Sequence, residues 1–342
     1  MAEIEKVIFD LEVVTPMFLG GADAKTAELR AASLKGLMRY WWRALQAESD
    51  MEILRKKEND IFGSTDKGGS FAIRMVYTDL RGIKESFPRH LVPVEGKDFK
   101  INILEYLAYG TYDYVKGKGN VFSREYIQPN KRFKLIITIR GRKEEILRTF
   151  YIFSLFGGIG SRNRNGFGSF DVLNKAEAFL PLKTDYSIDN PYESSNLSKL
   201  VKKVDSQPYT CFSTQTKVFK SKELFDSWDT AMAGVGKIYR EARLKLEGKH
   251  IYEKRQYIGA PIIEKKVTRS FLDRHAKPYF IKIDRESGKY RAYILYLPSM
   301  YCEGLDKDID GGAINRHIVN SEFQKICKEF NEYLSKKLDK IL

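Results

Sequence analysis

The stretch ELRAASLKGLMRYWWRAL, residues 28–45, carries cations at a spacing that could bind phosphate. Lys35, Arg39 and Arg43 recur every four residues, so a helix would align them in one ridge, with Arg30 just before it. Trp42 would lie within about 40° of Lys35, where it could brace the ridge or offer a stacking plane to a base. The pattern predicts an anion-binding helix face at Arg30, Lys35, Arg39, Trp42 and Arg43.

The same stretch also has a simpler interpretation as an ordinary amphipathic helix. An apolar stripe runs through Leu34, Leu37, Met38, Trp41 and Leu45, so both tryptophans could be core and the cations a solvated face. Glycines at positions 20 and 21 favour the anion site, because they bring loop backbone close to the N–H groups of residues 32–35. These N–H groups mark the positive end of a helix, where phosphate binds readily.

A second candidate is the glycine-rich segment FGGIGSRNRNGFGSF, residues 156–170. Glycines permit close backbone approach, and successive N–H groups can cradle phosphate oxygens beside arginine forks. The candidate contacts in this glycine loop are Gly157, Gly158, Gly160, Ser161, Arg162, Arg164, Gly166 and Gly168. A purely structural turn is the alternative. The loop lacks the G-x-x-x-x-G-K-[ST] pattern and follows a helix, so no nucleotide cofactor is expected.

The composition indicates a basic protein with a sizeable core. Of 342 residues, 43% are apolar, and Lys+Arg (59) exceed Asp+Glu (45) by 14. That excess attracts polyanions, which leaves RNA, DNA and anionic membranes open. Three cysteines without a C-x-x-C pair argue against a disulfide framework and a zinc ribbon. With strand-like alternation at the N-terminus and no membrane-length apolar run, a cytoplasmic location is expected.

The elements that must position the two candidates follow from hydrophobic periodicity. Alternation predicts strands at 4–14, 69–80, 133–140 and 167–173, and helical spacing predicts a helix capped by Ser33 and another over 143–156, ended by Gly157. A long excursion, 87–132, is expected to be an inserted hairpin whose tyrosines at 106–114 contact neighbouring subunits. The order β-α-β-(insert)-β-α-β is that of a split βαβ domain.

The second half repeats this order. We expect a strand at 209–219, a helix at 221–246, a hairpin at 277–298 turning at Ser287-Gly288, and a last helix over 323–341. No closing strand is evident. The predicted fold class is therefore α+β, with two tandem ferredoxin-like domains at 1–175 and 176–342, the second lacking its last strand. RNA-recognition domains use this topology to present an open sheet face, although topology alone does not establish function.

Two stretches carry a family resemblance. Together, the basic helix and the glycine loop resemble the RAMP superfamily of CRISPR effector proteins, which pair ferredoxin-like domains with a glycine-rich loop after the second helix. VTPMFLGGADAKTAELRAASLKGLMRYWWRAL, residues 14–45, is similar to the opening of the type III-B Cmr-complex subunit family conventionally numbered one. Residues 257–283 resemble that family's G-x-P and R-x-x-S-P segment, except that Lys277 stands where the serine would fall.

The resemblance implies a function for the chain. It implies a non-catalytic subunit of a ribonucleoprotein that binds guide RNA near its 3′ part, binds target RNA and contacts other Cmr subunits, without a membrane, metal or cofactor. By position, Lys35, Arg39, Trp42 and Arg43 lie on the family's basic helix, and residues 157–168 are its glycine loop. We expect both surfaces to line one groove for a sugar-phosphate chain.

Three other functions are open at this point. A guide-processing RAMP endoribonuclease would pair an acid/base histidine with the glycine loop, but the four histidines are His90, His250, His275 and His317, and none lies on the first helix. The segment DKDIDGGAINRH, 306–317, has calcium-loop spacing, yet His317 stands where a bidentate Glu is needed. A membrane-surface role is disfavoured, because both best helices have a sheet to cover.

Overall fold

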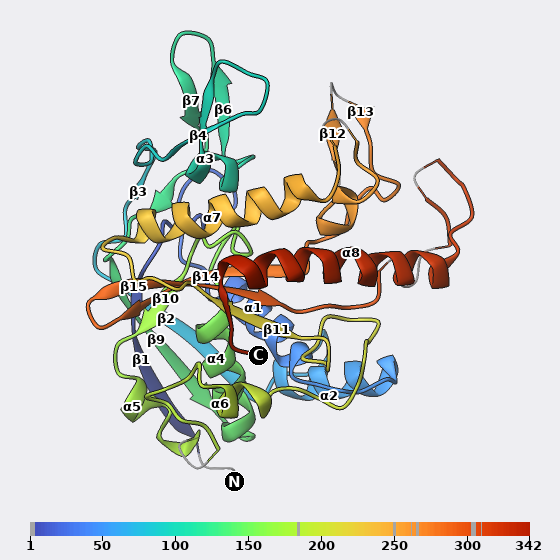
Figure 1. Cartoon of the computed structure of the whole chain (residues 1–342). Coiled ribbons are helices and arrows are strands. Elements are labelled where there is room, and N and C mark those ends of the chain that lie inside the picture. Colours follow the sequence, from blue (N-terminus) through green and yellow to red (C-terminus); the bar gives the residue numbers. More distant parts are fainter. Residues whose placement is uncertain are drawn as a thin grey trace.

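The computed structural model describes residues 4–342 except 183–184, 249–250, 261, 265–266, 302–305 and 309 (Figure 1). Two four-stranded antiparallel sheets form its body. In each sheet the first and third strands in chain order are central, and the second and fourth are at the edges. The structure thus has the expected α+β class with antiparallel sheets.

The first sheet has the strand order β10-β1-β9-β2. Its strands are β1 (Glu5–Val13), β2 (Phe71–Val76), β9 (Arg132–Ile139) and β10 (Phe170–Val172). Strand alternation on β1 buries Phe9, Leu11 and Val13 and leaves Lys6 and Ile8 exposed, as period-2 patterning dictates. Three helices connect the strands: α1 (Ala31–Ala44) and α2 (Met51–Phe62) precede β2, and α4 (Lys143–Phe156) precedes β10.

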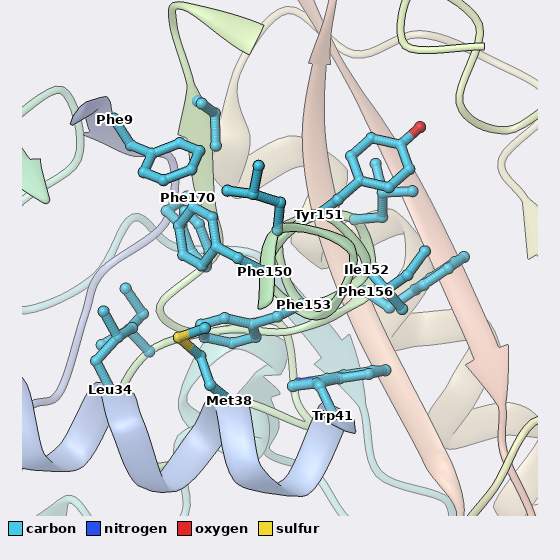
Figure 2. Packing of buried hydrophobic residues seen from close by; sticks show 14 of the residues in the cluster. Phe9, Leu34, Met38, Trp41, Phe150, Tyr151, Ile152, Phe153, Phe156 and Phe170 are labelled. Carbon is cyan, nitrogen blue, oxygen red and sulfur yellow. The ribbon is translucent and has the colours of Figure 1, made fainter. Parts of the chain in front are cut away.

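Helices α1 and α4 cover one face of this sheet. Figure 2 shows α1 presenting Leu34, Met38 and Trp41 to α4. The rings of Phe9 and Phe150 are 4.5 Å apart, so the sheet and α4 meet through aromatic contacts. The opposite face carries charged, polar and aliphatic side chains, and its described residues include no aromatic ring: Lys6, Ile8, Asp10, Glu12, Ala72, Arg74, Val76, Arg132, Lys134, Ile136, Thr138 and Asp171.

The second sheet has the order β14-β15-β11-β16. Its strands are β11 (Lys217–Lys220), β14 (Tyr279–Glu286), β15 (Lys289–Tyr296) and β16 (Asp339–Lys340), with helices α7 (Trp228–Lys245) and α8 (Arg316–Lys337). The expectation that this unit has no closing strand is wrong. β16 pairs with β11 through Phe219↔Lys340 and Lys220↔Asp339, and two residues are too few for a periodic signal.

Both faces of the second sheet are covered. Tyr279 packs on Phe330 of α8, with ring centroids 4.6 Å apart, and Phe280 on the other face lies 5.4 Å from Trp41 of α1. The two sheets are therefore joined through α1 and α4 (Figure 1). An open, base-binding face of the kind used by RNA-recognition domains is absent from the described part of this second sheet.

The insertion between β2 and β9 is more elaborate than the predicted hairpin. Its elements are β3 (Gly82–Ile83), β4 (Leu91–Pro93), β5 (Lys100–Asn102), α3 (Ile103–Leu107), β6 (Tyr112–Val115), β7 (Gly119–Phe122) and β8 (Tyr126–Ile127). Helix α3 packs on α7, where the Gly236 position lies against Leu107 and Ile103. The insertion therefore joins the two halves of the chain.

Short elements complete the chain: α5 (Lys175–Ala178), η1 (Leu180–Leu182), α6 (Ser194–Ser198), η2 (Arg255–Ile258), β12 (Ile263–Glu264) and β13 (Val267–Thr268). Helix α7 begins at Trp228, seven residues later than expected, because Ser227 and Thr230 form a capping box there. The Ser287-Gly288 turn has positive φ at both residues, as predicted for a tight hairpin. None of the helices described in the structure is long and apolar enough to cross a bilayer.

Candidate nucleic-acid interface

The cations predicted on α1 are held by neighbouring elements. Arg39 Nε lies 3.3 Å from Glu58 Oε1, and Arg43 Nη1 lies 3.0 Å from Glu58 Oε2. Lys35 Nζ lies 5.1 Å from the ring centroid of Phe71 on β2. Burial, followed by the Arg39 charge, lowers the pKa of Lys35. The ridge exists, but Glu58 neutralises half of the charge of its two arginines.

Glu58 belongs to α2, an element that the sequence analysis did not predict. Asp50 caps this helix by accepting hydrogen bonds from the N–H groups of Glu52 and Ile53. Asp50 before Glu52, followed by Leu54 and Ile61 at i and i+7, is the signal that could have identified it.

Trp42 is part of the core, which contradicts its predicted role as a stacking plane. Only 1% of its surface is exposed. Its indole N–H donates to Glu145 Oε1 at 2.8 Å, and its ring lies 6.1 Å from that of Phe62. The alternative interpretation, with both tryptophans in the core, is confirmed.

The glycine loop is built into the protein through its backbone. Ser161 N–H donates to the Phe18 carbonyl at 2.7 Å, which ties the loop to the chain leaving β1. Gly160, Gly166 and Gly168 have φ of +97°, +92° and +68°, a region that glycine adopts without strain. A Cβ at Gly168 would collide with the Ile159 carbonyl oxygen. These glycines are therefore required for the path of the loop.

The first two glycines of the loop are required for packing. Gly157 ends α4, as predicted, in an extended conformation (φ −96°, ψ 175°) and not in the left-handed one that glycines often adopt after a helix. A Cβ there would clash with the ring of Phe153 and lie 2.7 Å from Trp41 Nε1. A Cβ at Gly158 would lie 2.6 Å from the Phe167 carbonyl oxygen.

The two arginines of the glycine loop have different surroundings. Arg164 points toward the second sheet, where Nη1 donates to the Lys277 carbonyl and the guanidinium lies 4.5 Å from the Phe280 ring centroid. Its own carbonyl accepts a 3.1 Å hydrogen bond from Ile281 N–H. Arg164 therefore joins the two halves of the chain. Arg162, in contrast, is exposed and adopts positive φ (+59°).

The glycine loop forms one wall of a hollow of about 340 Å³. The other walls are the loop after β1, the beginning of α1 and Arg124 of the insertion. The lining residues are Phe18, Leu19, Gly20, Gly21, Ala24, Ser33, Leu37, Arg124, Glu125, Gly160 and Ser161. We call this the glycine-loop hollow. It confirms that the glycines at 20–21, the start of α1 and the glycine loop come together.

Helix α1 begins at this hollow without a side-chain cap. Its N-cap is Arg30, whose side chain is exposed, and its first turn has no acidic residue. Ser33 was expected to cap the helix, but the helix begins at Ala31, two residues earlier, because Arg30 already has the extended backbone of an N-cap. The positive end of the helix dipole therefore lies beside the hollow without a neutralising carboxylate in the first turn.

Arg124 lines the glycine-loop hollow, and Arg162 directly follows its lining residue Ser161. Desolvation, and then the Arg124 charge, lower the pKa of Arg162, which indicates that the two guanidinium groups repel one another. Among the described residues neither has a carboxylate partner; Glu125 beside them accepts from Ala27 N–H at 3.0 Å. No local sequence pattern identifies Arg124 as part of this site, because only tertiary folding brings the insertion to the glycine loop.

A second hollow, of about 630 Å³, lies beside the cationic ridge. Its lining residues are Arg39, Arg43, Met51, Leu54, Arg55, Glu58, Asn59, Phe62, Gly63, Ser64 and Thr65. We call it the α2 hollow. The two hollows share no lining residue, and at 100° per residue Arg39 lies about 200° around α1 from Leu37. The prediction that the ridge and the glycine loop line one groove is therefore wrong.

The described histidines lie outside both hollows. His90 Nε2 is 2.7 Å from Asp229 Oδ2, and His317 is exposed at the start of α8. Burial, followed by the Arg164 charge, lowers the pKa of His275 to about 4. His250 lies outside the described residues. Within the described part of the chain, no three His, Cys, Asp or Glu side chains gather as metal ligands would.

The segment with calcium-loop spacing forms a hydrogen-bonded turn. Asp308 Oδ1 accepts from the N–H groups of Asp310 and Gly312, at 3.0 and 2.7 Å. Arg316 bonds to Asp306. These carboxylates are engaged within their own turn.

Comparisons with known proteins identify the family. A model of the RAMP superfamily matches residues 10–171. The chain is 30% identical over 190 residues to the CRISPR system Cmr subunit Cmr1-2 of Pyrococcus furiosus, an alignment that covers 51% of this chain and 99% of that protein. It is 27% identical over 203 residues to Cmr1-1 of the same organism, covering 55% of this chain and 54% of that protein.

Solved structures share the fold. The crystal structure of Cmr1 from Pyrococcus furiosus in its apo form gives a TM-score of 0.59 at 19% identity, covering 98% of both chains. A chain of the type III-B Cmr-beta complex, solved by cryo-EM with cognate target RNA and AMPPnP, gives a TM-score of 0.54 at 14% identity, covering 95% of this chain and 100% of that one. The chain belongs to the RAMP superfamily and, within it, to the Cmr1 family.

Proposed function

We propose that this chain is a non-catalytic, RNA-binding subunit of a type III-B Cmr effector complex. It binds single-stranded RNA, the 3′ part of the guide or the target, through phosphates at the glycine-loop hollow. The observation that carries this proposal is the pair Arg124 and Arg162, two neighbouring guanidinium groups that have no carboxylate partner among the described residues. An anion between them would relieve their repulsion.

The surroundings of the hollow support a phosphate. The uncapped start of α1 supplies backbone N–H groups and a positive dipole end, and the exposed side chain of Arg30 adds a further cation. Gly20, Gly21 and Gly160 leave the walls without side chains, so a sugar-phosphate chain can approach the backbone. The cryo-EM structure of the Cmr-beta complex, which holds cognate target RNA, supports an RNA ligand and partner subunits by homology.

The scaffold for this function is a pair of tandem ferredoxin-like domains, 1–175 and 176–342. The matching strand orders of the two sheets support the division. The glycine loop belongs to the first domain, and Arg164 and the insertion reach the second domain. RNA in the glycine-loop hollow would therefore lie close to the joint between the two domains.

Salt dependence of RNA binding tests the proposed contacts. Each phosphate contact to single-stranded RNA contributes about 0.7 to the slope of log affinity against log salt, so R124A/R162A should flatten the slope by about 1.4. R39A/R43A removes the same number of arginines from the Glu58 side and is the matched control, expected to leave the slope unchanged. Wild-type slope in R124A/R162A would reject the glycine-loop hollow as the RNA site.

Absence of cleavage is a separate part of the proposal. His90 is bound to Asp229, and His275 is held neutral by burial, so neither stands ready as an acid/base at the glycine loop. We expect the purified chain, incubated with labelled repeat RNA and without metal, to leave it intact. Single-site cleavage that persists after further purification would establish the guide-processing endoribonuclease instead.

A further inference from the structure

The insertion carries the two most exposed aromatic side chains among the described residues. Tyr109 is 71% exposed and Tyr114 is 76% exposed. Tyr109 lies in the turn after α3, and Tyr114 lies on strand β6. Figure 1 shows the β6–β7 hairpin projecting beyond α3 and α7, away from both sheets. Exposed rings on a projecting element are accessible to a ligand.

The base of this hairpin is fixed relative to the glycine-loop hollow. Phe122 of β7 is buried, with its ring centroid 5.9 Å from that of Phe18. Phe18 is the residue whose carbonyl accepts the Ser161 N–H of the glycine loop. Phe18 therefore contacts both the base of the hairpin and the glycine loop, which fixes the hairpin relative to the hollow.

Tyr109 lies next to one of the two proposed phosphate contacts. The Arg162 guanidinium packs so closely on Gly110 that a Cβ there would collide with Nη2, and Gly110 has φ of +85°. Tyr109 and Tyr112 both influence the pKa of Arg162, after desolvation and Arg124. The rings of Tyr109 and Tyr112 meet edge to face at 6.5 Å, which orients the Tyr109 ring.

The charge around these rings favours nucleic acid over protein. The four cations Lys116, Lys118, Arg124 and Arg162 outnumber the three carboxylates Glu105, Asp113 and Glu125. Two of these carboxylates are already engaged: Glu105 accepts a 2.7 Å hydrogen bond from Asn120, and Glu125 accepts one of 3.0 Å from Ala27 N–H. Aromatic rings among cations bind single strands, because each base stacks on a ring while its phosphate meets a cation.

We propose that Tyr109 is a nucleobase-stacking platform for single-stranded RNA, next to the phosphate contacts Arg124 and Arg162. This inference rests on the proposed function and adds a base-binding subsite to it. An RNA strand that crosses the glycine-loop hollow places one base on the exposed ring of Tyr109. Stacking of this kind tolerates any base, because every base has a flat face.

Substitution of Tyr109 in the full-length chain tests the platform. Y109A should weaken binding of a single-stranded oligonucleotide at least about fivefold at every salt concentration, with the salt slope unchanged because no phosphate contact is lost. Y109F keeps the ring and should bind like wild type. Y114A is the matched control: it removes an equally exposed ring that does not adjoin Arg162, so its affinity should stay within about twofold of wild type.

An abasic oligonucleotide allows a double-mutant cycle between Tyr109 and one base of the RNA. Such a cycle is not affected by a change in the stability of the variant protein. A single abasic nucleotide at the position that crosslinks to Tyr109 should weaken binding to wild type, and should cause no further loss in Y109A. If Y109A binds like wild type while R124A/R162A flattens the slope, the platform is rejected and the proposed function stands. If neither variant changes binding, both fail. If Y109A binds RNA normally but no longer copurifies with other Cmr subunits, the surface docks protein, and the inference is overturned.

Discussion

Two arginines lie on each side of α1, but the two pairs differ in whether a carboxylate neutralises them. On the α2 side, Arg39 and Arg43 share the carboxylate of Glu58. On the glycine-loop side, Arg124 and Arg162 repel one another beside an uncapped helix start. Charge that is already paired gains little from a phosphate, because the new contact replaces an existing one. The comparison indicates that a phosphate-binding surface is marked by cations that lack a carboxylate partner, and not by cations alone.

Charge reversal at the unpaired arginines should have the largest effect. R124E/R162E replaces two attractive contacts by repulsion, and with about 1.5 kcal/mol for each charge-assisted contact we expect at least about a hundredfold loss of RNA affinity at moderate salt. R39E/R43E in the same assay should lose much less, since no phosphate contact is proposed there. An equal loss in the two variants would remove the distinction between the two sides of α1.

His275, which lies near Arg164 at the contact between the two halves of the chain, should make the stability of the protein depend on pH. Burial, followed by the Arg164 charge, lowers the pKa of His275 to about 4 from 6.5, so the unfolded chain binds the additional proton between these values. Stability is therefore complete above about pH 6.5 and is lost as pH falls, by about 2 kcal/mol at pH 5.

Urea unfolding of wild type and H275F at pH 5 and pH 7 measures this loss. The phenylalanine keeps a ring against Tyr301, whose centroid lies 3.9 Å from that of His275, but does not titrate. The drop between the two pH values should be smaller in the variant by about 2 kcal/mol. Equal drops would show that His275 is protonated in the folded protein.

The smallest effects are expected from alanine substitutions at two glycines, one in the glycine loop and one in α1, which should change the free energy of unfolding in opposite directions. G168A should lower the free energy of unfolding by at least about 1 kcal/mol, because φ is positive and the new methyl meets the Ile159 carbonyl oxygen. Gly36 lies inside α1 with nothing within 4 Å of an added Cβ. Because alanine loses less backbone entropy in a helix than glycine does, G36A should raise the free energy of unfolding by about 0.5–1 kcal/mol. Thermal or urea unfolding of the two variants measures both changes.

Local patterns were sufficient for most of the regular elements. Alternation in β1 and β9 and the apolar spacing of α4 identified these elements within one or two residues, because one face of each is buried. The two-residue strand β16 had no periodic signal, and the caps at Asp50 and Ser227 went unnoticed, so α2 was missed and α7 was expected too early.

The candidate site was less accessible to sequence reasoning. Proximity of the start of α1 to the glycine loop followed from the arrangement of a split βαβ unit. The pairing of these residues did not follow from it. Glu58, 15 residues beyond Arg43, engages both Arg39 and Arg43, and Glu145, 103 residues beyond Trp42, engages Trp42. Arg124 entered the site from an insertion whose path no local pattern encodes.

A crosslink map tests the central claim most directly. Single-stranded RNA with photoreactive uridines would be bound to the full-length chain, irradiated and digested, and the crosslinked peptides identified by mass spectrometry. We predict crosslinks in residues 18–33, 105–124 and 157–164, around the glycine-loop hollow. Crosslinks confined to residues 39–65, around the α2 hollow, would contradict the account.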